Sequence, residues 1–146
     1  MRLVRERERF CLHAEHAAMA CPFGFELWGS DAAHLQAVVE EATDALDVLE
    51  QQLSAYVPTS DVCWLNAVAA DAPARVDPEL FDLLTLAARL HQETGGAFDI
   101  TAGPLIRCWS FFQREAAVPE PAALAEARER VGMEQVRLDR EEQTVF

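Results

Sequence analysis

The chain has 146 residues, 51% of them apolar, and a formal net charge of −13, which indicates one globular domain and excludes a disordered chain. Binding along a nucleic-acid phosphate backbone needs clustered positive charge, and the net charge of −13 argues against it. All 12 basic residues are arginine, so a P-loop lysine and a lysine Schiff base are excluded as well. No apolar run approaches the roughly 20 residues of a membrane span, and arginines interrupt the N-terminal segment where a signal peptide would be apolar. We therefore expect no nucleic-acid partner, no membrane span and, for the chain as written, a cytoplasmic location.

The first part of the chain predicts two strands and a long helix. Apolar residues alternate from Arg9 to Ala17 and again from Phe23 to Leu27, which predicts two antiparallel strands joined by a short loop. Asp31 offers an N-cap for a helix whose apolar residues recur at three- and four-residue steps. The expected buried stripe is Leu35, Val38, Val39, Ala42, Leu46, Leu49 and Leu53. The expected solvated face carries Glu40, Glu41, Asp44, Asp47 and Glu50.

The second part predicts two further helices and a terminal hairpin. Pro58 ends the long helix, and Asp77-Pro78-Glu79 starts a second one that ends at Gly95-Gly96. Its expected buried stripe is Leu80, Leu83, Leu84, Ala87 and Leu90. A third helix is expected from Pro119 to Val131. The last residues predict a strand, a turn over 139–142 and a second strand that breaks off at Phe146.

These elements predict an α+β fold, with an antiparallel sheet built from both ends of the chain and two long helices packed on one face. Residues 1–146 are expected to form a single domain, apparently truncated at its C-terminal end.

The spacing of the cysteines and histidines along the sequence does not predict a metal site. The sequence contains four cysteines, Cys11, Cys21, Cys63 and Cys108. They form no C-x-x-C pair and have no histidine at zinc-finger spacing, so we interpret them as buried free thiols. His13 and His16 are three residues apart in an expected strand and should face opposite sides of it, which disfavours a shared metal ion.

The stretch "ETGGAFDITAGPLIRCW", residues 93–109, concentrates small residues around an aromatic ring and a carboxylate. Small residues let a ligand approach the backbone closely, while Asp99 could accept hydrogen bonds from a base or a ribose and Phe98 could shield a pocket. On local chemistry alone, a tight turn is favoured, with Phe98 in the core and Asp99 capping a backbone amide.

Several segments in order resemble the FAD:protein FMN transferases, the ApbE family. The matching segments are "AMACPF", "LSAYVPTSDVCWLN", "VDPELFDLL", "TGGAFDITAGPLIRCW" and "VGMEQVRLD". The resemblance covers nearly everything from about residue 14 onward, and its most specific part is TGGAFDIT. It implies the N-terminal half of an ApbE-like fold, because family members are expected to be about twice as long.

The resemblance implies five residues that contact FAD: Met19, Tyr56, Ala97, Phe98 and Asp99. The alternatives are that Met19 and Phe98 are core residues and that Tyr56 is a capped surface aromatic. A second set is expected mainly to shape the site: Ser54, Asn66, Thr101, Gly103 and Pro104. One departure is Ala20-Cys21, which stands where the family usually has Gly-Thr, so a β-carbon at position 20 is expected to tighten the local backbone.

The activity implied by the resemblance is the Mg²⁺-dependent transfer of FMN from FAD to a threonine of a target flavoprotein, with AMP released. A metal suits this chemistry because Mg²⁺ stabilises the charge that develops on phosphate oxygens. No metal ligand or catalytic residue can be assigned in this chain, and the ligands are expected in the missing C-terminal half. Two alternatives stay open: a non-catalytic flavin-binding module, or an inactive truncated fragment that lacks the metal-binding half.

Overall fold

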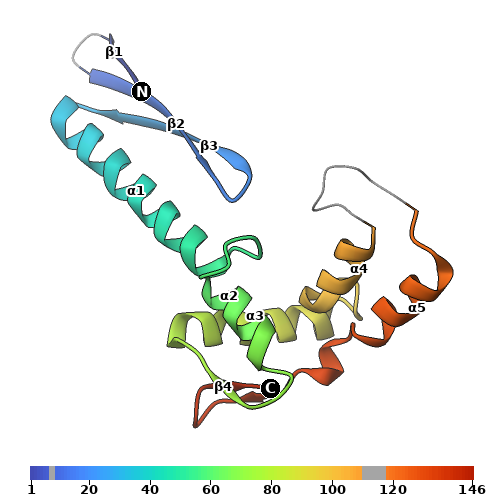
Figure 1. Cartoon of the computed structure of the whole chain (residues 1–146). Coiled ribbons are helices and arrows are strands. Elements are labelled where there is room, and N and C mark those ends of the chain that lie inside the picture. The colour runs from blue at the N-terminus through green and yellow to red at the C-terminus, as the bar shows by residue number, and fades with distance from the viewer. Residues whose placement is uncertain (7–8, 110–117) are drawn as a thin grey trace. The chain divides into compact units, whose positions relative to one another are not determined.

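The computed structural model describes residues 1–6, 9–109 and 118–146 (Figure 1). The chain divides into two compact units, Met1–Ala67 and Val68–Phe146. Both units combine helices with antiparallel strands, which confirms the α+β class. The prediction of one sheet built from both ends of the chain is wrong, because the strands from the two ends pair within their own units and form two separate three-stranded sheets.

The sheet of unit 1 has the order β1-β2-β3, with every neighbouring pair antiparallel. Its strands are β1 (Arg2–Glu6), β2 (Arg9–Ala18) and β3 (Cys21–Gly29). The sequence predicted β2 and β3, and their register runs from Phe10 opposite Gly29 to Ala18 opposite Cys21. Strand β1 was not predicted, because its charged residues hide the alternation that usually identifies a strand.

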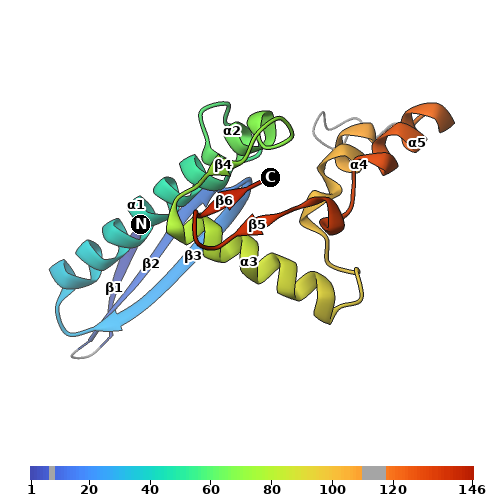
Figure 2. The ribbon, with the colours of Figure 1, turned by 90° about the horizontal axis from the view of Figure 1, so that it is seen from below.

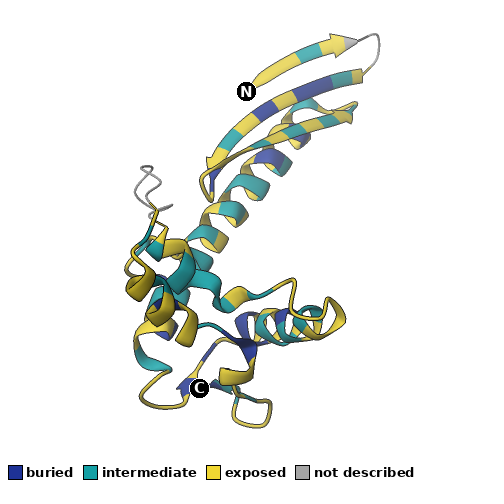
Figure 3. Cartoon of the chain, turned by 90° about the vertical axis from the view of Figure 1, so that its right-hand side faces the viewer, coloured by how far each residue is buried: buried dark blue, intermediate teal, exposed yellow. Residues whose placement is uncertain are grey.

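Helix α1 (Ala32–Leu53) covers one face of this sheet and contacts β2 and β3 (Figure 2). The predicted cap is present, since the Asp31 carboxylate accepts hydrogen bonds from the backbone N–H groups of Ala33 (2.9 Å) and His34 (3.2 Å). The core joins β2 to the first half of the helix through Leu12, Ala14, Leu35 and Val39, with Phe10, Phe25 and Leu27 packed around them. Figure 3 shows buried residues gathered along β2. The predicted stripe is wrong for Leu49, which is 39% exposed.

The sequence did not predict α2 (Asp61–Val68), which follows α1 after a short turn. Ser60 supplies its cap, because the Ser60 Oγ accepts a hydrogen bond from Cys63 N at 3.0 Å. Eight residues are too few to show a clear helical period in the sequence.

The long helix of unit 2 is α3 (Pro78–Glu93), which starts and ends as the sequence predicted. Asp77 accepts a hydrogen bond from Glu79 N at 2.9 Å, and Pro78 occupies the first turn. Its buried residues are Leu80, Phe81 and Ala87. The predicted stripe is right for Leu80 and Ala87, but it missed the buried Phe81 and wrongly included Leu83, which is 44% exposed.

Three short helices and one longer helix follow in the described part of unit 2. They are η1 (Ile100–Ala102), α4 (Gly103–Cys108), α5 (Pro121–Glu129) and η3 (Met133–Gln135). Helix α5 confirms the third predicted helix with a shorter span, and α4 packs against it. Gly132 lies just past this helix with a φ of 146°, a backbone angle that favours glycine.

The sheet of unit 2 has the order β4-β6-β5. Its strands are β4 (Ala74–Arg75), β5 (Leu138–Asp139) and β6 (Thr144–Val145), all antiparallel to their neighbours. This confirms the terminal hairpin, whose turn is held by Asp139 accepting hydrogen bonds from Glu141 N and Glu142 N. Strand β4 was not predicted, since two residues carry no period.

All four cysteines are free thiols, as predicted, but they are not all buried. Cys11 is buried and Cys21 is exposed, because Cys21 follows the β2–β3 turn directly. His13 and His16 do lie on opposite sides of β2: His16 contacts Asp47 of α1 at 2.6 Å, and His13 contacts Cys11 and Glu26. Among the described helices, none combines the length and the apolar character that crossing a membrane requires.

Candidate functional site

The five predicted site residues lie in three short turns. Met19 and Tyr56 belong to unit 1, and Ala97, Phe98 and Asp99 belong to unit 2. In both units the turns that carry them are fixed by hydrogen bonds to the end of a long helix, α1 in unit 1 and α3 in unit 2.

Met19 and Ala20 form the two-residue turn between β2 and β3. Both have positive φ angles, 51° and 58°, as a type I′ hairpin turn requires. Met19 N donates a hydrogen bond to Glu50 Oε1 at 2.9 Å, which attaches the turn to the last turn of α1. The Met19 residue is 38% exposed, so the alternative that it is a core residue is wrong. Glu50 was predicted to face only solvent and instead holds this turn.

Tyr56 follows α1 in a turn organised by Ser54. The Ser54 Oγ accepts hydrogen bonds from Tyr56 N (3.1 Å) and Val57 N (3.2 Å), while Ser54 N donates to Glu50 O at 3.0 Å. Met19 and Tyr56 are therefore both attached through Glu50 to the end of α1. Tyr56 is 66% exposed, which leaves its side chain accessible to a ligand.

A buried serine closes the same turn. Ser60 has no exposed surface, and its Oγ donates a hydrogen bond to Ser54 O at 2.6 Å. Cys63 Sγ lies 3.5 Å from the same carbonyl oxygen. These contacts bind the two ends of the segment that carries Tyr56, so its backbone is defined before any ligand arrives.

Ala97, Phe98 and Asp99 follow the glycine cap of α3. Gly95 and Gly96 have φ angles of 61° and 86°, which confirms the predicted C-cap. Phe98 N donates to Thr94 Oγ1 at 3.0 Å, which turns the chain back toward the helix. Phe98 is 41% exposed, so the alternative that it is a core residue is wrong.

Asp99 caps the backbone, as local chemistry predicted. Its Oδ1 accepts hydrogen bonds from Thr101 N (2.7 Å) and Thr101 Oγ1 (2.5 Å). Thr101 Oγ1 in turn accepts a hydrogen bond from Gly132 N at 2.7 Å, which connects two segments 31 residues apart. The second carboxylate oxygen, Oδ2, lies 3.6 Å from His91 Nδ1. Capping occupies only Oδ1, so Oδ2 can still accept a hydrogen bond from a ligand.

No sequence pattern pointed to the residues that hold these turns from the ends of the helices. Glu50 and His91 lie in the last turns of α1 and α3, and Thr94 is the C-cap of α3, where a sequence pattern reports only burial and capping. Glu50 is 31 residues from Met19, so no local spacing links them. His91 and Thr94 are closer to Phe98, and their position just before a glycine cap was the one available signal.

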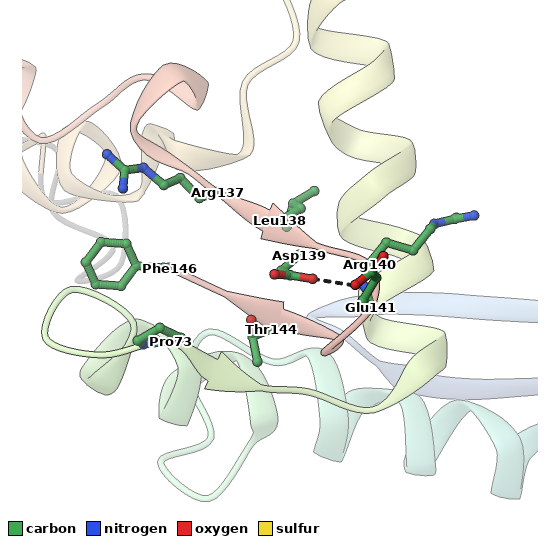
Figure 4. A pocket seen from close by; sticks show the side chains of 8 residues that line it. All are labelled: Pro73, Arg137, Leu138, Asp139, Arg140, Glu141, Thr144 and Phe146. Atoms are coloured by element: carbon green, nitrogen blue, oxygen red, sulfur yellow. Dashed lines mark hydrogen bonds between the residues drawn. The ribbon is translucent and has the colours of Figure 1, made fainter.

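A hollow of about 580 Å³ lies over the sheet of unit 2 (Figure 4). Its lining residues are Pro73, Arg137, Leu138, Asp139, Arg140, Glu141, Thr144 and Phe146. On one side, the Arg137 guanidinium carbon lies 5.8 Å from the centre of the Phe146 ring. None of the five predicted site residues lines this hollow, so it is distinct from the turns described above.

The described residues do not supply a metal site. Across residues 1–6, 9–109 and 118–146, no group of three or more His, Cys, Asp or Glu side chains is arranged to hold an ion. The part of the chain that the structure describes therefore does not fit a Mg²⁺ site by itself.

Solved structures of ApbE proteins share this fold. The flavinyl transferase ApbE of Pseudomonas stutzeri matches with a TM-score of 0.80 and 25% identity, over 92% of this chain and 43% of its own. The ApbE protein of Thermotoga maritima has the same fold, with a TM-score of 0.85 and 22% identity, over 93% of this chain and 44% of its own. The family model described as ApbE family matches residues 19–145, and the chain belongs to this family.

Curated relatives agree with this assignment. The FAD:protein FMN transferase of Treponema pallidum is 39% identical over 107 residues, which cover 73% of this chain and 30% of that protein. The FAD:protein FMN transferase of Klebsiella pneumoniae is 30% identical over 112 residues, which cover 75% of this chain and 32% of that protein. The chain thus spans about a third of the length of these relatives.

Proposed function

We propose that this chain forms part of an FAD:protein FMN transferase and supplies one wall of its FAD site. The observation that carries the proposal is the match to curated transferases through the segments that contain the predicted contacts. In the proposal, Met19 and Tyr56 contact FAD, and Ala97, Phe98 and Asp99 contact its flavin nucleotide part. Residues 1–146 then belong to one flavin transferase domain that continues in the longer protein.

The geometry of the turns supports a binding role. Tyr56 and Phe98 are both more than 40% exposed, and aromatic rings of this kind can stack on a planar flavin. Asp99 Oδ2 can accept a hydrogen bond, whereas Oδ1 is occupied by Thr101. Preformed turns also lower the entropy that binding costs, since the ligand does not have to order them.

The chemistry proposed for the complete protein is cleavage of the FAD pyrophosphate. A threonine hydroxyl of the target flavoprotein forms a bond to the FMN phosphorus, and AMP leaves. Mg²⁺ would stabilise the charge on the phosphate oxygens, with ligands from residues outside this chain. The acceptor threonine and the target flavoprotein are part of the proposal.

A chimera with the Treponema pallidum relative tests the proposed function. The matched 107-residue segment of that protein is replaced by the corresponding segment of this chain, and AMP released from FAD with Mg²⁺ and a target flavoprotein is measured by chromatography. We expect AMP to be released within about tenfold of the parent rate, and the Phe98→Ala chimera to lose at least about tenfold more. A folded chimera that binds FAD and releases no AMP would favour a flavin-binding module without turnover. A folded chimera that does not bind FAD would contradict the proposal.

A further inference from the structure

His91 contacts the turn that carries Phe98 and Asp99. It lies in the last turn of α3, and its Nδ1 is 2.9 Å from the Phe98 carbonyl oxygen and 3.6 Å from Asp99 Oδ2. A carbonyl oxygen only accepts hydrogen bonds, so Nδ1 carries a proton and donates it to Phe98. The ring is mostly buried, with 24% of its side chain exposed, and the Asp99 side chain is 18% exposed.

The peptide groups of Phe98 are held from both sides by α3. His91 binds the Phe98 carbonyl, and Thr94 Oγ1 accepts the Phe98 N–H at 3.0 Å. Thr94 Oγ1 itself donates to Leu90 O at 2.8 Å, so its orientation is fixed by the helix. Gly96 lies beside the imidazole, where a β-carbon would make an ordinary van der Waals contact with His91 Cε1 at 3.6 Å, and its φ of 86° is what favours glycine. The end of the helix therefore fixes the backbone from which the Phe98 and Asp99 side chains project.

We propose that His91 is a positioning residue of the flavin site, an inference that rests on the proposed function. It fixes the Phe98 backbone and stands beside Asp99 Oδ2, the oxygen that capping leaves for a ligand. A misplaced Phe98 or Asp99 would weaken the contacts to the flavin nucleotide, because binding contacts depend on the geometry being formed in advance. No direct contact between His91 and the ligand is required.

Two amide variants separate the role of Nδ1 from the bulk of the ring. In His91→Asn the side-chain nitrogen occupies the place of Nδ1, two bonds beyond Cβ, and can still donate to Phe98. In His91→Gln the nitrogen occupies the place of Nε2, and the donor at Nδ1 is lost. Both variants are polar, so they should behave alike if position 91 needs only a polar side chain. They should differ if the position needs a hydrogen-bond donor at the place of Nδ1.

The experiment compares the 146-residue chain with its His91→Asn and His91→Gln variants in two measurements. Hydrogen exchange without flavin should show the Phe98 and Thr101 amides exchanging about fivefold faster in His91→Gln than in the unchanged chain, and within about twofold of it in His91→Asn. FAD titration followed by flavin fluorescence should show about fivefold weaker binding in His91→Gln and near-normal binding in His91→Asn. Thermal unfolding of all three chains shows whether they are equally folded.

The outcomes separate this inference from the proposed function. Equal exchange and equal FAD affinity in both variants would overturn the positioning role, and so would faster exchange with unchanged FAD affinity. If the folded, unchanged chain binds no FAD, then FAD binding by this chain is refuted and with it the flavin-site role of His91. In that case the exchange measurement alone decides whether His91 fixes the turn.

Discussion

The β2–β3 turn gives a prediction that can be worked from backbone angles. Ala20 has a φ of 58°, and a left-handed angle costs a residue with a β-carbon roughly 1–2 kcal/mol. Glycine avoids that cost, but it makes the unfolded chain more flexible, which lowers the free energy of unfolding by about 0.4–1 kcal/mol. Ala20 is exposed, so no packing is lost when its methyl group is removed. We therefore expect Ala20→Gly to raise the free energy of unfolding by about 0.5–1 kcal/mol.

Ala17→Gly is a matched control for this change. Ala17 is also exposed and lies in β2 opposite Pro22, outside the positive-φ turn. The same substitution in a strand should lower the free energy of unfolding by roughly 0.5–1 kcal/mol. Urea unfolding followed by circular dichroism measures both variants. If Ala20→Gly destabilises the chain as Ala17→Gly does, the turn is not held in the left-handed conformation and the reasoning is refuted.

Three further predictions follow from single contacts. Asp31→Ala should lower the free energy of unfolding by about 1 kcal/mol because it removes the α1 cap, and Asp31→Ser should restore most of this stability. Urea unfolding measures both variants, and equal stability of the two would contradict the role of the cap. Thr101→Val should lower the free energy of unfolding by about 1–3 kcal/mol, since Gly132 N loses its acceptor, whereas Thr101→Ser should lower it far less. Thermal unfolding measures both variants, and equal stability of the two would show that the hydroxyl is not needed. Cys21 should react with a thiol reagent at once, whereas Cys11 should react only when the chain unfolds. Mass spectrometry of labelled peptides measures both, and rapid labelling of Cys11 in the folded chain would contradict its burial.

Local sequence signals predicted the elements that carry strong caps and long periods. Asp31 and Asp77 marked the starts of α1 and α3, and Gly95-Gly96 marked the end of α3. These signals are local, because a cap depends on residues within one helical turn. Strands β1 and β4 were missed, since a charged strand and a two-residue strand are defined by their partners rather than by their own composition.

The sequence offered candidate residues for the site, which stay a prediction, but not the residues that hold their turns. The family resemblance pointed to Met19 and Asp99, and the structure places both in hydrogen-bonded turns. The bonds that fix those turns come from Glu50, His91 and Gly132, and the bonds from Glu50 and Gly132 span 31 residues. Such contacts depend on how the elements pack, which no spacing along the chain encodes.

The central claim, that this chain forms part of an FAD site, is tested most directly by FAD titration of the purified 146-residue chain with Mg²⁺, followed by flavin fluorescence. Asp99→Ala is the test variant, and Glu93→Ala is its matched control, because Glu93 is an exposed acid at the end of α3 that pairs with Arg89 of the same helix. We expect saturable binding by the unchanged chain and by Glu93→Ala, and at least about tenfold weaker binding by Asp99→Ala. A well-folded chain without saturable binding, or an Asp99→Ala variant that binds as tightly as Glu93→Ala, would contradict the claim.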